Sequence, residues 1–209
     1  MASQSEPGAA ATPRRAPAPG QRQRDAERSR QALLAAALDE FAEHGYAGTR
    51  VAGIAERAGV NKQLINYYFG SKEGLYLAVQ RAWLEREESF AGPEVPLPEL
   101  VARYLADALR DPRPSRLLLW HGLAGEAPPD PGPGRHPGVD QVAARQEAGE
   151  VAADLDPAAV LLAAMGMILA PVALPRVARE LLHADPFSED FRERYAEQLR
   201  RIVAHLSGG

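Results

Sequence analysis

The 209-residue sequence contains no cysteine, few aromatic residues and no long hydrophobic run. The lack of cysteine excludes disulfides, thiolate catalysis and cysteine-based zinc sites, and it is consistent with a reducing compartment. The longest apolar stretch, residues 160–174, is shorter than the roughly 20 residues that a membrane-spanning helix needs, and it contains Pro171. The first 20 residues have no apolar segment typical of a secretory signal. We therefore expect a cytoplasmic protein without contact with a membrane.

The motifs of common enzyme classes are also missing. The five histidines are scattered and form no His-x-x-x-His pair, and the sequence has no Gly-x-Ser-x-Gly, Gly-x-Gly-x-x-Gly or phosphate-binding Gly-Lys-Ser/Thr segment. Asp154 and Asp156 are close in sequence, but Pro157 follows them and favours a role in helix capping. We therefore predict no catalytic residue, no metal ligand and no cofactor. An enzyme is the alternative that a turnover assay against a substrate panel would reveal.

Charge is divided unevenly along the chain. Residues 1–72 carry ten Lys and Arg against seven Asp and Glu, a net charge of +3, whereas residues 73–209 carry a net charge of −7. A basic N-terminal part on an acidic body indicates that this end meets a polyanion. Ala, Pro and Gly fill 12 of the first 20 positions, which predicts a disordered tail over residues 1–20.

The rest of the chain has the pattern of an all-α protein. Ala, Leu, Glu and Arg dominate, and no segment shows the sustained alternation of a strand. Five Pro and four Gly between Gly125 and Gly138 predict a loop. The expected helices are Arg24–His44, Thr49–Ala58, Asn61–Phe69, Lys72–Ser89, Leu97–Arg110, Ser115–Leu123, Gly138–Ala152, Pro157–Ala170, Val172–His183 and Ser188–Leu206.

The segment TRVAGIAERAGVNKQLINYYFGSKEGL, residues 49–75, has the punctuation of a helix-turn-helix. Thr49 is a suitable N-cap for a first short helix, and Gly59 ends it. Asn61 is a suitable N-cap for a second short helix, and Gly70 ends that one. Two short helices joined by a tight turn that contains glycine form the helix-turn-helix pattern.

The spacing of apolar residues separates a buried face from an outward face. The apolar side chains on the buried faces of the two short helices are expected to pack against Leu34, Leu38 and Phe41 of the first helix and form a small core with them. The outward face of the second helix is polar and contains no acidic side chain, whereas a face that is merely solvated usually includes Glu or Asp. Its Gln and Asn side chains suit adenine edges, its Lys suits guanine or phosphate, and its Tyr suits phosphate or thymine. This face consists of Lys62, Gln63, Asn66 and Tyr67.

Lys72 occupies an unusual position for a cation. Ser71 is expected to cap the third helix, so that Lys72 lies in its first turn, where the helix dipole disfavours a positive charge. A phosphate bound at this helix N-terminus would explain the position. The alternative is a solvated lysine that costs a few tenths of a kcal/mol.

From about Arg24 to Val79, about a quarter of the chain, the sequence resembles the N-terminal DNA-binding domain of the tetracycline-repressor (TetR) family. Three positions depart from the family pattern: Asn61 stands where Ser is usual, Asn66 where Tyr often contacts the backbone, and Leu64 where a small polar residue is common. These departures leave the fold expectation intact and the operator sequence open. The matching residues are Phe41, Gly45, Tyr46, Thr49, Ile54, Ala55, Ala58, Gly59, Val60, Tyr68, Phe69, Ser71, Lys72 and Leu75.

The resemblance implies an all-α fold with two domains and a set of DNA contacts. It implies a helix-turn-helix DNA-binding domain at residues 21–75 and a larger helical domain for effector binding and dimerisation at residues 76–209. Thr49 and Arg50 would touch phosphates, and Tyr68 and Lys72 would clamp the DNA backbone. The major groove would receive Lys62, Gln63, Asn66 and Tyr67.

The resemblance also implies a homodimer on a palindromic operator, since one helix-turn-helix reads few base pairs. The expected dimer surface combines the apolar segment Ala159–Ala170, in which Gly166 permits close approach, with a stripe on the last helix. That stripe consists of Phe191, Tyr195, Leu199, Ile202 and Leu206. The alternative is that both surfaces are simply core of the monomer.

A regulatory pocket for a small hydrophobic effector is expected within residues 90–185. Aromatic and Met side chains at helical spacing are more often plain core than pocket lining, so each candidate carries both interpretations. The expected function is that of a ligand-responsive transcriptional repressor, and the alternatives are an activator or an architectural DNA-binding protein without an effector. The candidate lining residues are Tyr104, Trp120, His121, Met165 and Met167.

Overall fold

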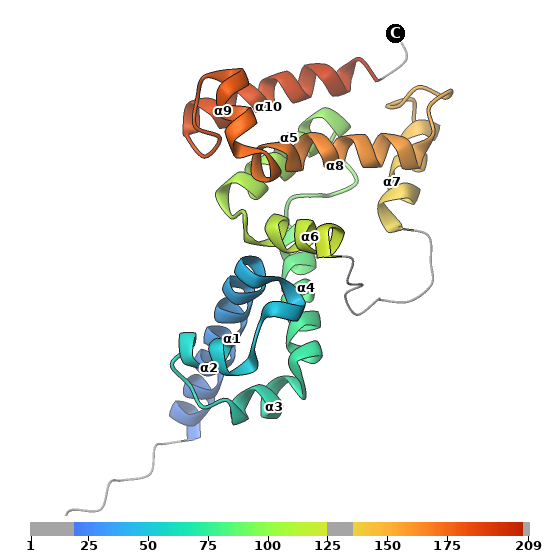
Figure 1. Ribbon diagram of the computed structural model, residues 1–209. Coiled ribbons are helices and arrows are strands. Elements are labelled where there is room, and N and C mark those ends of the chain that lie inside the picture. Colours follow the sequence, from blue (N-terminus) through green and yellow to red (C-terminus); the bar gives the residue numbers. More distant parts are fainter. Residues whose placement is uncertain (1–18, 125–135, 207–209) are drawn as a thin grey trace, which may run out of the picture.

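The computed structural model describes residues 19–124 and 136–206, and within these residues all regular structure is helical. This confirms the predicted all-α fold. Figure 1 shows α1 to α4 at one end of the molecule, α5 and α7 to α10 at the other end, and α6 between them. The helices are α1 (Pro19–Gly48), α2 (Val51–Arg57), α3 (Gln63–Phe69), α4 (Lys72–Glu88), α5 (Leu97–Arg110), α6 (Arg113–Ala124), α7 (Pro137–Glu147), α8 (Pro157–Ala173), α9 (Pro175–Leu182) and α10 (Glu189–Ala204).

The first hydrophobic core joins α1, α2, α3 and α4. Leu33 and Phe41 of α1 are completely buried in it, whereas the predicted stripe residues Leu34 and Leu38 lie at its margin and are only partly buried. The centre of the α1 face is therefore rotated toward Leu33 relative to the prediction. Leu117 of α6 joins this core, so α6 is packed directly on the end of the molecule that contains α1 to α4.

The second core is built around α5, which packs against α8 and α10. Phe191 and Leu199 of α10 are 1% and 0% exposed and belong to this core. For these two residues of the α10 stripe the alternative interpretation, core of the monomer, is therefore correct, because α5 of the same chain covers their side chains. Ile202 is the large apolar side chain of that stripe that stays exposed, at 46%.

The break between α8 and α9 lies later than the sequence indicated. Pro171 is inside α8 and buried, and the helix continues to Ala173. The chain turns at Leu174 (φ −127°, ψ 53°), because the residue before a proline, here Pro175, is disfavoured in the helical region. No single helix among the described residues is long and apolar enough to cross a membrane; α8 and α9 together meet that test by length and composition, but they meet at 92°.

Other boundaries follow the predicted glycine signals with small shifts. Gly45 has φ 69° and marks the end of the regular part of α1, although a further turn runs to Gly48. Helix α7 ends at Glu147 rather than at Ala152, because Gly149 adopts φ 81°. The predicted tail lies outside the described residues except for Pro19 and Gly20, which begin α1, and residues 125–135 of the predicted loop are also outside them.

Candidate DNA-binding interface

The turn between α2 and α3 has the geometry of a helix-turn-helix. Gly59 adopts φ 65°, a left-handed conformation that favours glycine, and its N–H donates to the carbonyl of Glu56 at 3.0 Å. The N–H of Val60 donates to the carbonyl of Ala55 at 3.0 Å. Asn61 Oδ1 then accepts from the N–H of Gln63 at 2.9 Å, the bond expected of it, although the N-cap of α3 is Lys62, one residue later than predicted.

The C-terminal end of α3 is equally well defined. Gly70 has φ 75°, and its N–H donates to the carbonyl of Asn66 at 3.0 Å. Ser71 is the N-cap of α4, and its hydroxyl accepts from the N–H of Gly74 at 3.0 Å, as predicted. Local hydrogen bonds therefore fix where α3 begins and where it ends.

Each of the two short helices has one buried face and one exposed face, as the spacing of apolar residues predicted. Ile54 and Ile65 are 0% exposed, and Ala55 is 4% exposed. The outward side chains of α3 are all exposed, and Tyr67 is 78% exposed. An aromatic ring left in water this completely is unusual for a monomer surface that only needs solvation. The exposed face, called the reading face below, consists of Lys62, Gln63, Asn66 and Tyr67.

Thr49 does not have the position that the sequence indicated. Its side chain is buried, and its hydroxyl donates toward the carbonyls of Glu40 and Gly45, at 2.9 Å and 2.7 Å. The N-cap of α2 is Arg50, which makes no side-chain capping bond. The prediction that Thr49 caps α2 is therefore wrong, and its hydroxyl is not available to a phosphate, because it is bonded to carbonyls of the C-terminal part of α1. Arg50 is exposed.

Lys72 has a partner inside the protein. Its ammonium lies 4.5 Å from the centroid of the Tyr46 ring, a cation–π contact that accounts for a cation in the first turn of α4. The external phosphate invoked from sequence is therefore not needed to explain its position. The ring of Tyr46 stacks on Phe41 and meets Tyr76 edge-on at 5.1 Å, so Lys72 rests on the aromatic part of the first core.

Arg57 anchors α2 to α1, a contact that the sequence patterns did not reveal. Its Nε lies 2.8 Å from a carboxylate oxygen of Glu40, and its two terminal nitrogens bond both oxygens of Glu43. This bidentate pairing lowers the pKa of Glu43 and raises that of Arg57. Glu40, Glu43 and His44 also bring ligand atoms within 4.8 Å of one another. Both carboxylates are already bound by Arg57, which gives the cluster a structural role.

Helix α6 makes polar contacts with both α1 and α4. The indole N–H of Trp120 donates to the carbonyl of Ala42 at 3.2 Å, and Arg113 pairs with Asp39 of α1 at 2.7 Å. On α4, the hydroxyl of Tyr76 lies 2.6 Å from Nε2 of His121. Helix α6 is therefore hydrogen-bonded to the two helices that flank the helix-turn-helix.

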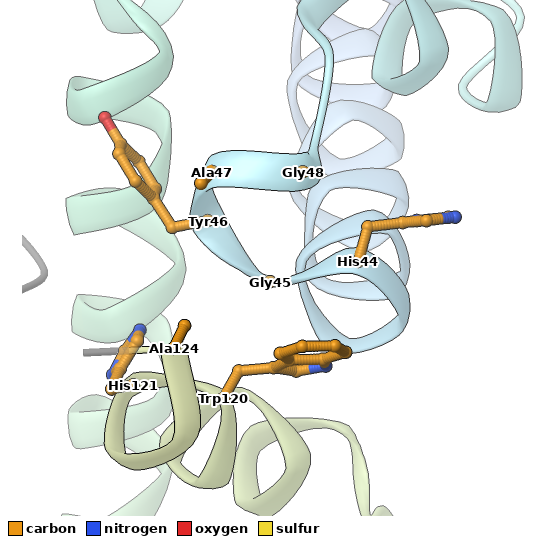
Figure 2. A pocket seen from close by; sticks show the side chains of 8 residues that line it. All are labelled: His44, Gly45, Tyr46, Ala47, Gly48, Trp120, His121 and Ala124. Carbon is orange, nitrogen blue, oxygen red and sulfur yellow. The ribbon is translucent and has the colours of Figure 1, made fainter. Parts of the chain in front are cut away.

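Two of the five candidate effector residues line a cavity together. Trp120 and His121 line a cavity of about 200 Å³ at the junction of the two ends of the molecule (Figure 2). Tyr104 instead donates its hydroxyl to Glu87, and burial raises its pKa. The carbonyl of Met167 accepts from Tyr195 at 3.0 Å. Tyr104, Met165 and Met167 line neither this cavity nor a second one of about 320 Å³ beside α10, so an effector site at these three residues stays a prediction.

Two family models match the chain. The model for bacterial regulatory proteins of the tetR family matches residues 33–79, and the model for the tetracyclin repressor-like C-terminal domain matches residues 96–201. The second match covers the region that contains the second core, where the sequence patterns alone had given no family signal. The chain is therefore matched at both its helix-turn-helix and its larger helical domain.

Similar proteins of known name are also helix-turn-helix transcriptional regulators. The HTH-type transcriptional repressor SCO4008 of Streptomyces coelicolor is 31% identical over 192 residues, which cover 86% of this chain and 97% of that protein. RutR of Escherichia coli K12, an HTH-type transcriptional regulator, is 42% identical over 113 residues, but the match spans only about half of each chain, 51% and 53%.

The fold is shared with solved structures of regulators. The putative transcriptional regulator SCO4942 from Streptomyces coelicolor superimposes with a TM-score of 0.63 at 26% identity, covering 83% of this chain and 97% of that one. The helix-turn-helix geometry, the two family models and these relatives agree, and none of them indicates an enzyme. This chain belongs to the TetR family of helix-turn-helix transcriptional regulators.

Proposed function

We propose that this regulator is a repressor that binds a palindromic operator as a homodimer and leaves it when a small effector binds. The observation that carries the DNA-binding part is the reading face of α3. Its four polar side chains are exposed, none is acidic, and local hydrogen bonds fix both ends of the helix that presents them.

The reading face suits the edges of bases in the major groove. Gln63 and Asn66 each offer an amide that pairs in a bidentate way with adenine, and Lys62 suits guanine or phosphate. Arg50, Tyr68 and Lys72 flank this face and suit the DNA backbone on either side. The sequence contains only two lysines: Lys62 belongs to the reading face, and Lys72 flanks it.

The dimer is supported by an exposed apolar face on α8. Leu162 is 72% exposed, and the residues around it on the same face are small and uncharged. Exposure of such an apolar face to water is unfavourable in free energy. Its small residues permit close approach of a second helix. The side chains that form it are Ala158, Ala159, Leu162, Ala163 and Gly166, and Ile202 of α10 is also exposed.

Effector control is supported by the relatives. One solved structure that is 26% identical, with a TM-score of 0.52, is described as the molecular basis for control of antibiotic production by a bacterial hormone. SCO4008, which matches nearly over its full length, is named a repressor. A hydrophobic effector suits the apolar character of the middle helices. An activator and an architectural protein without an effector are the competing functions.

Selection of bound DNA from a random pool at about 0.15 M salt tests the proposal. Recovery of an inverted repeat is the expected result, since a two-fold symmetric dimer reads two equal half-sites. Retention without a motif, which fades steeply as salt rises, would instead identify an architectural protein. A reporter gene behind the recovered repeat then separates repression from activation.

The two lysines allow a direct test of the interface. Labelling lysines by reductive ¹³C-methylation gives signals from Lys62, Lys72 and the N-terminal amine alone, because the sequence has no other lysine. Addition of the selected DNA is expected to shift both lysine signals. Unchanged lysine signals with bound DNA would place the DNA elsewhere on the protein.

A further inference from the structure

A chain of alternating charges runs from the helix-turn-helix to the end of α5. It begins at Arg57 of α2, where a terminal nitrogen lies 3.8 Å from a carboxylate oxygen of Asp39 on α1. Asp39 in turn accepts from Arg113, the first residue of α6, at 2.7 Å. Arg113 also pairs with Asp111, the C-cap residue of α5. Cations and anions therefore alternate over α2, α1, α6 and α5.

The same chain of charges continues to α4. Arg86, near the C-terminal end of α4, lies 3.7 Å from Asp111 and donates to Asp107 of α5 at 3.0 Å. Asp107 is 8% exposed, and the exposed Arg110 bonds its other oxygen at 2.7 Å. Asp111 therefore pairs with residues of both α4 and α6.

Arg113 uses a single guanidinium for two different helices. Its Nε and one terminal nitrogen bond the two oxygens of Asp111, each at 2.8 Å, and its other terminal nitrogen bonds Asp39, 74 positions earlier in the sequence. The bidentate pair lowers the pKa of Asp111 and raises that of Arg113. Such a pair fixes the plane of the guanidinium as well as its distance. The planar fork therefore sets the direction from the end of α5 to Asp39 of α1.

The apolar contacts of α6 join the two cores without setting this direction. Leu117 is buried in the first core, whereas Leu119 packs against the second core. Hydrophobic attraction depends on the buried area and is not directional, so by itself it permits small rotations of one core against the other. Isolated surface ion pairs contribute little to stability, but bidentate geometry and networks of several charges are the cases in which they do contribute.

In the proposed dimer, the angle between the two cores sets the distance between the two reading faces. The exposed apolar face lies on α8, which packs into the second core through Val160 and Val172. The reading face lies on α3, which packs into the first core through Ile65. Two reading faces held at one separation fit one half-site spacing, because this spacing follows from the geometry of the dimer.

We propose that Arg113 is a positioning residue that fixes the angle between the two cores through Asp39 and Asp111, and thereby restricts the operator to one half-site spacing. It acts on DNA only through this angle. The spacing rests on the proposed function, a dimer on a palindromic operator, whereas the angle does not and is measured without DNA.

The angle is measured by double electron–electron resonance on the full chain. Because the sequence has no cysteine, Glu56→Cys on α2 and Glu193→Cys on α10, both exposed positions, supply the two sites for nitroxide labels. Dilution with unlabelled chain restricts the signal to distances within one chain. A single narrow distance distribution is expected, and Arg113→Met is expected to replace it with a broad one. Arg176→Met, which removes an ion pair within α9 at a side chain that is 89% exposed, is the matched control and is expected to leave the distribution narrow.

Asp39→Asn breaks the same link from the α1 side, so the test does not depend on the folding of one variant. It is expected to broaden the distribution as Arg113→Met does. The double variant is expected to broaden it no further, since both residues act through one contact. A narrow distribution in both single variants, or equal broadening by Arg176→Met, overturns the positioning role.

The spacing is measured separately, by selection of DNA from a random pool. Arg113→Met is expected to recover the same half-site, with its preference for the original spacing over neighbouring spacings reduced roughly three-fold or more. An unchanged preference together with a broadened distance distribution overturns the spacing role, while dimeric DNA binding stands. If the chain without the Arg113 substitution selects no inverted repeat, the proposed function and the spacing role both fail, and the distance distribution still decides the angle.

Discussion

The hydroxyl of Tyr76 on α4 lies 2.6 Å from Nε2 of His121 on α6, and it also accepts from Gln80 at 3.1 Å. Tyr76 is 0% exposed, and burial raises its pKa to about 12. The hydroxyl therefore keeps its proton at ordinary pH, and its hydrogen bond joins α4 to α6.

Tyr76→Phe is expected to destabilise the protein by about 1–2 kcal/mol, because it leaves the half-buried ring nitrogen of His121 and the amide of Gln80 without this partner. Urea unfolding measures the change. Tyr67→Phe is the matched control, since Tyr67 is 78% exposed and its hydroxyl is expected to contribute little to stability. Equal stability of the two variants would contradict a structural role for the junction contact.

Stability is expected to fall on mild acidification. Burial lowers the pKa of His121 in the folded state below its usual value near 6.5. The contribution of the neutral ring is therefore fully present above about pH 6.5 and is lost as pH falls from there through the folded pKa. Unfolding free energies at pH 7.5 and 5.5 measure the effect. His121→Gln is expected to reduce the difference, and an undiminished difference would assign it to the other histidines.

Thr49→Val and Arg50→Ala are expected to have opposite effects. Loss of the buried hydroxyl that donates toward Glu40 and Gly45 costs about 1 kcal/mol of stability and leaves the DNA affinity of the folded protein unchanged. Loss of the exposed Arg50 is expected to weaken DNA binding and to leave stability unchanged. Urea unfolding and DNA titration of both variants check this, and a DNA defect in Thr49→Val alone would restore the phosphate role first expected of it.

Asn66→Ala and Lys72→Ala are expected to differ in specificity. Asn66→Ala removes a base contact, weakens binding to the selected operator by about 1–3 kcal/mol and relaxes preference at particular base pairs. Gln63→Ala is expected to act in the same way. Lys72→Ala weakens binding to all sequences alike and reduces the salt slope by about 1. Unchanged affinity and preference in Asn66→Ala would show that α3 does not read bases as proposed.

Leu162→Glu is expected to convert the dimer to monomers, because it places a charge on the exposed apolar face of α8. Sedimentation at micromolar concentration measures the oligomeric state, and the same variant is expected to lose affinity for an inverted repeat. Leu123→Glu is the matched control, since Leu123 is 82% exposed on α6, away from that face. Dissociation of both variants, or of neither, would place the dimer surface elsewhere.

Local signals determined most of the helix-turn-helix. Gly59 and Gly70 end their helices with positive φ, and Asn61 and Ser71 make the predicted capping bonds, because these effects depend on residues within a few positions. The outward direction of Gln63 and the rest of the reading face follows from helical periodicity alone. The sequence therefore determined the fold class and the candidate DNA-contacting residues.

The tertiary structure decided which apolar faces are buried and which polar groups already have partners. The α10 stripe is equally apolar whether it meets α5 or a second chain, and only the packing shows that α5 covers Phe191 and Leu199. Likewise, the sequence alone is compatible with a capping role or a turn-stabilising role for Thr49. The folded chain decides between them, because it places the carbonyl of Glu40 within hydrogen-bond distance of the Thr49 hydroxyl. The junction cavity joins residues more than 70 positions apart. Periodicity and capping act over one or two turns, so they do not carry information about such distant partners.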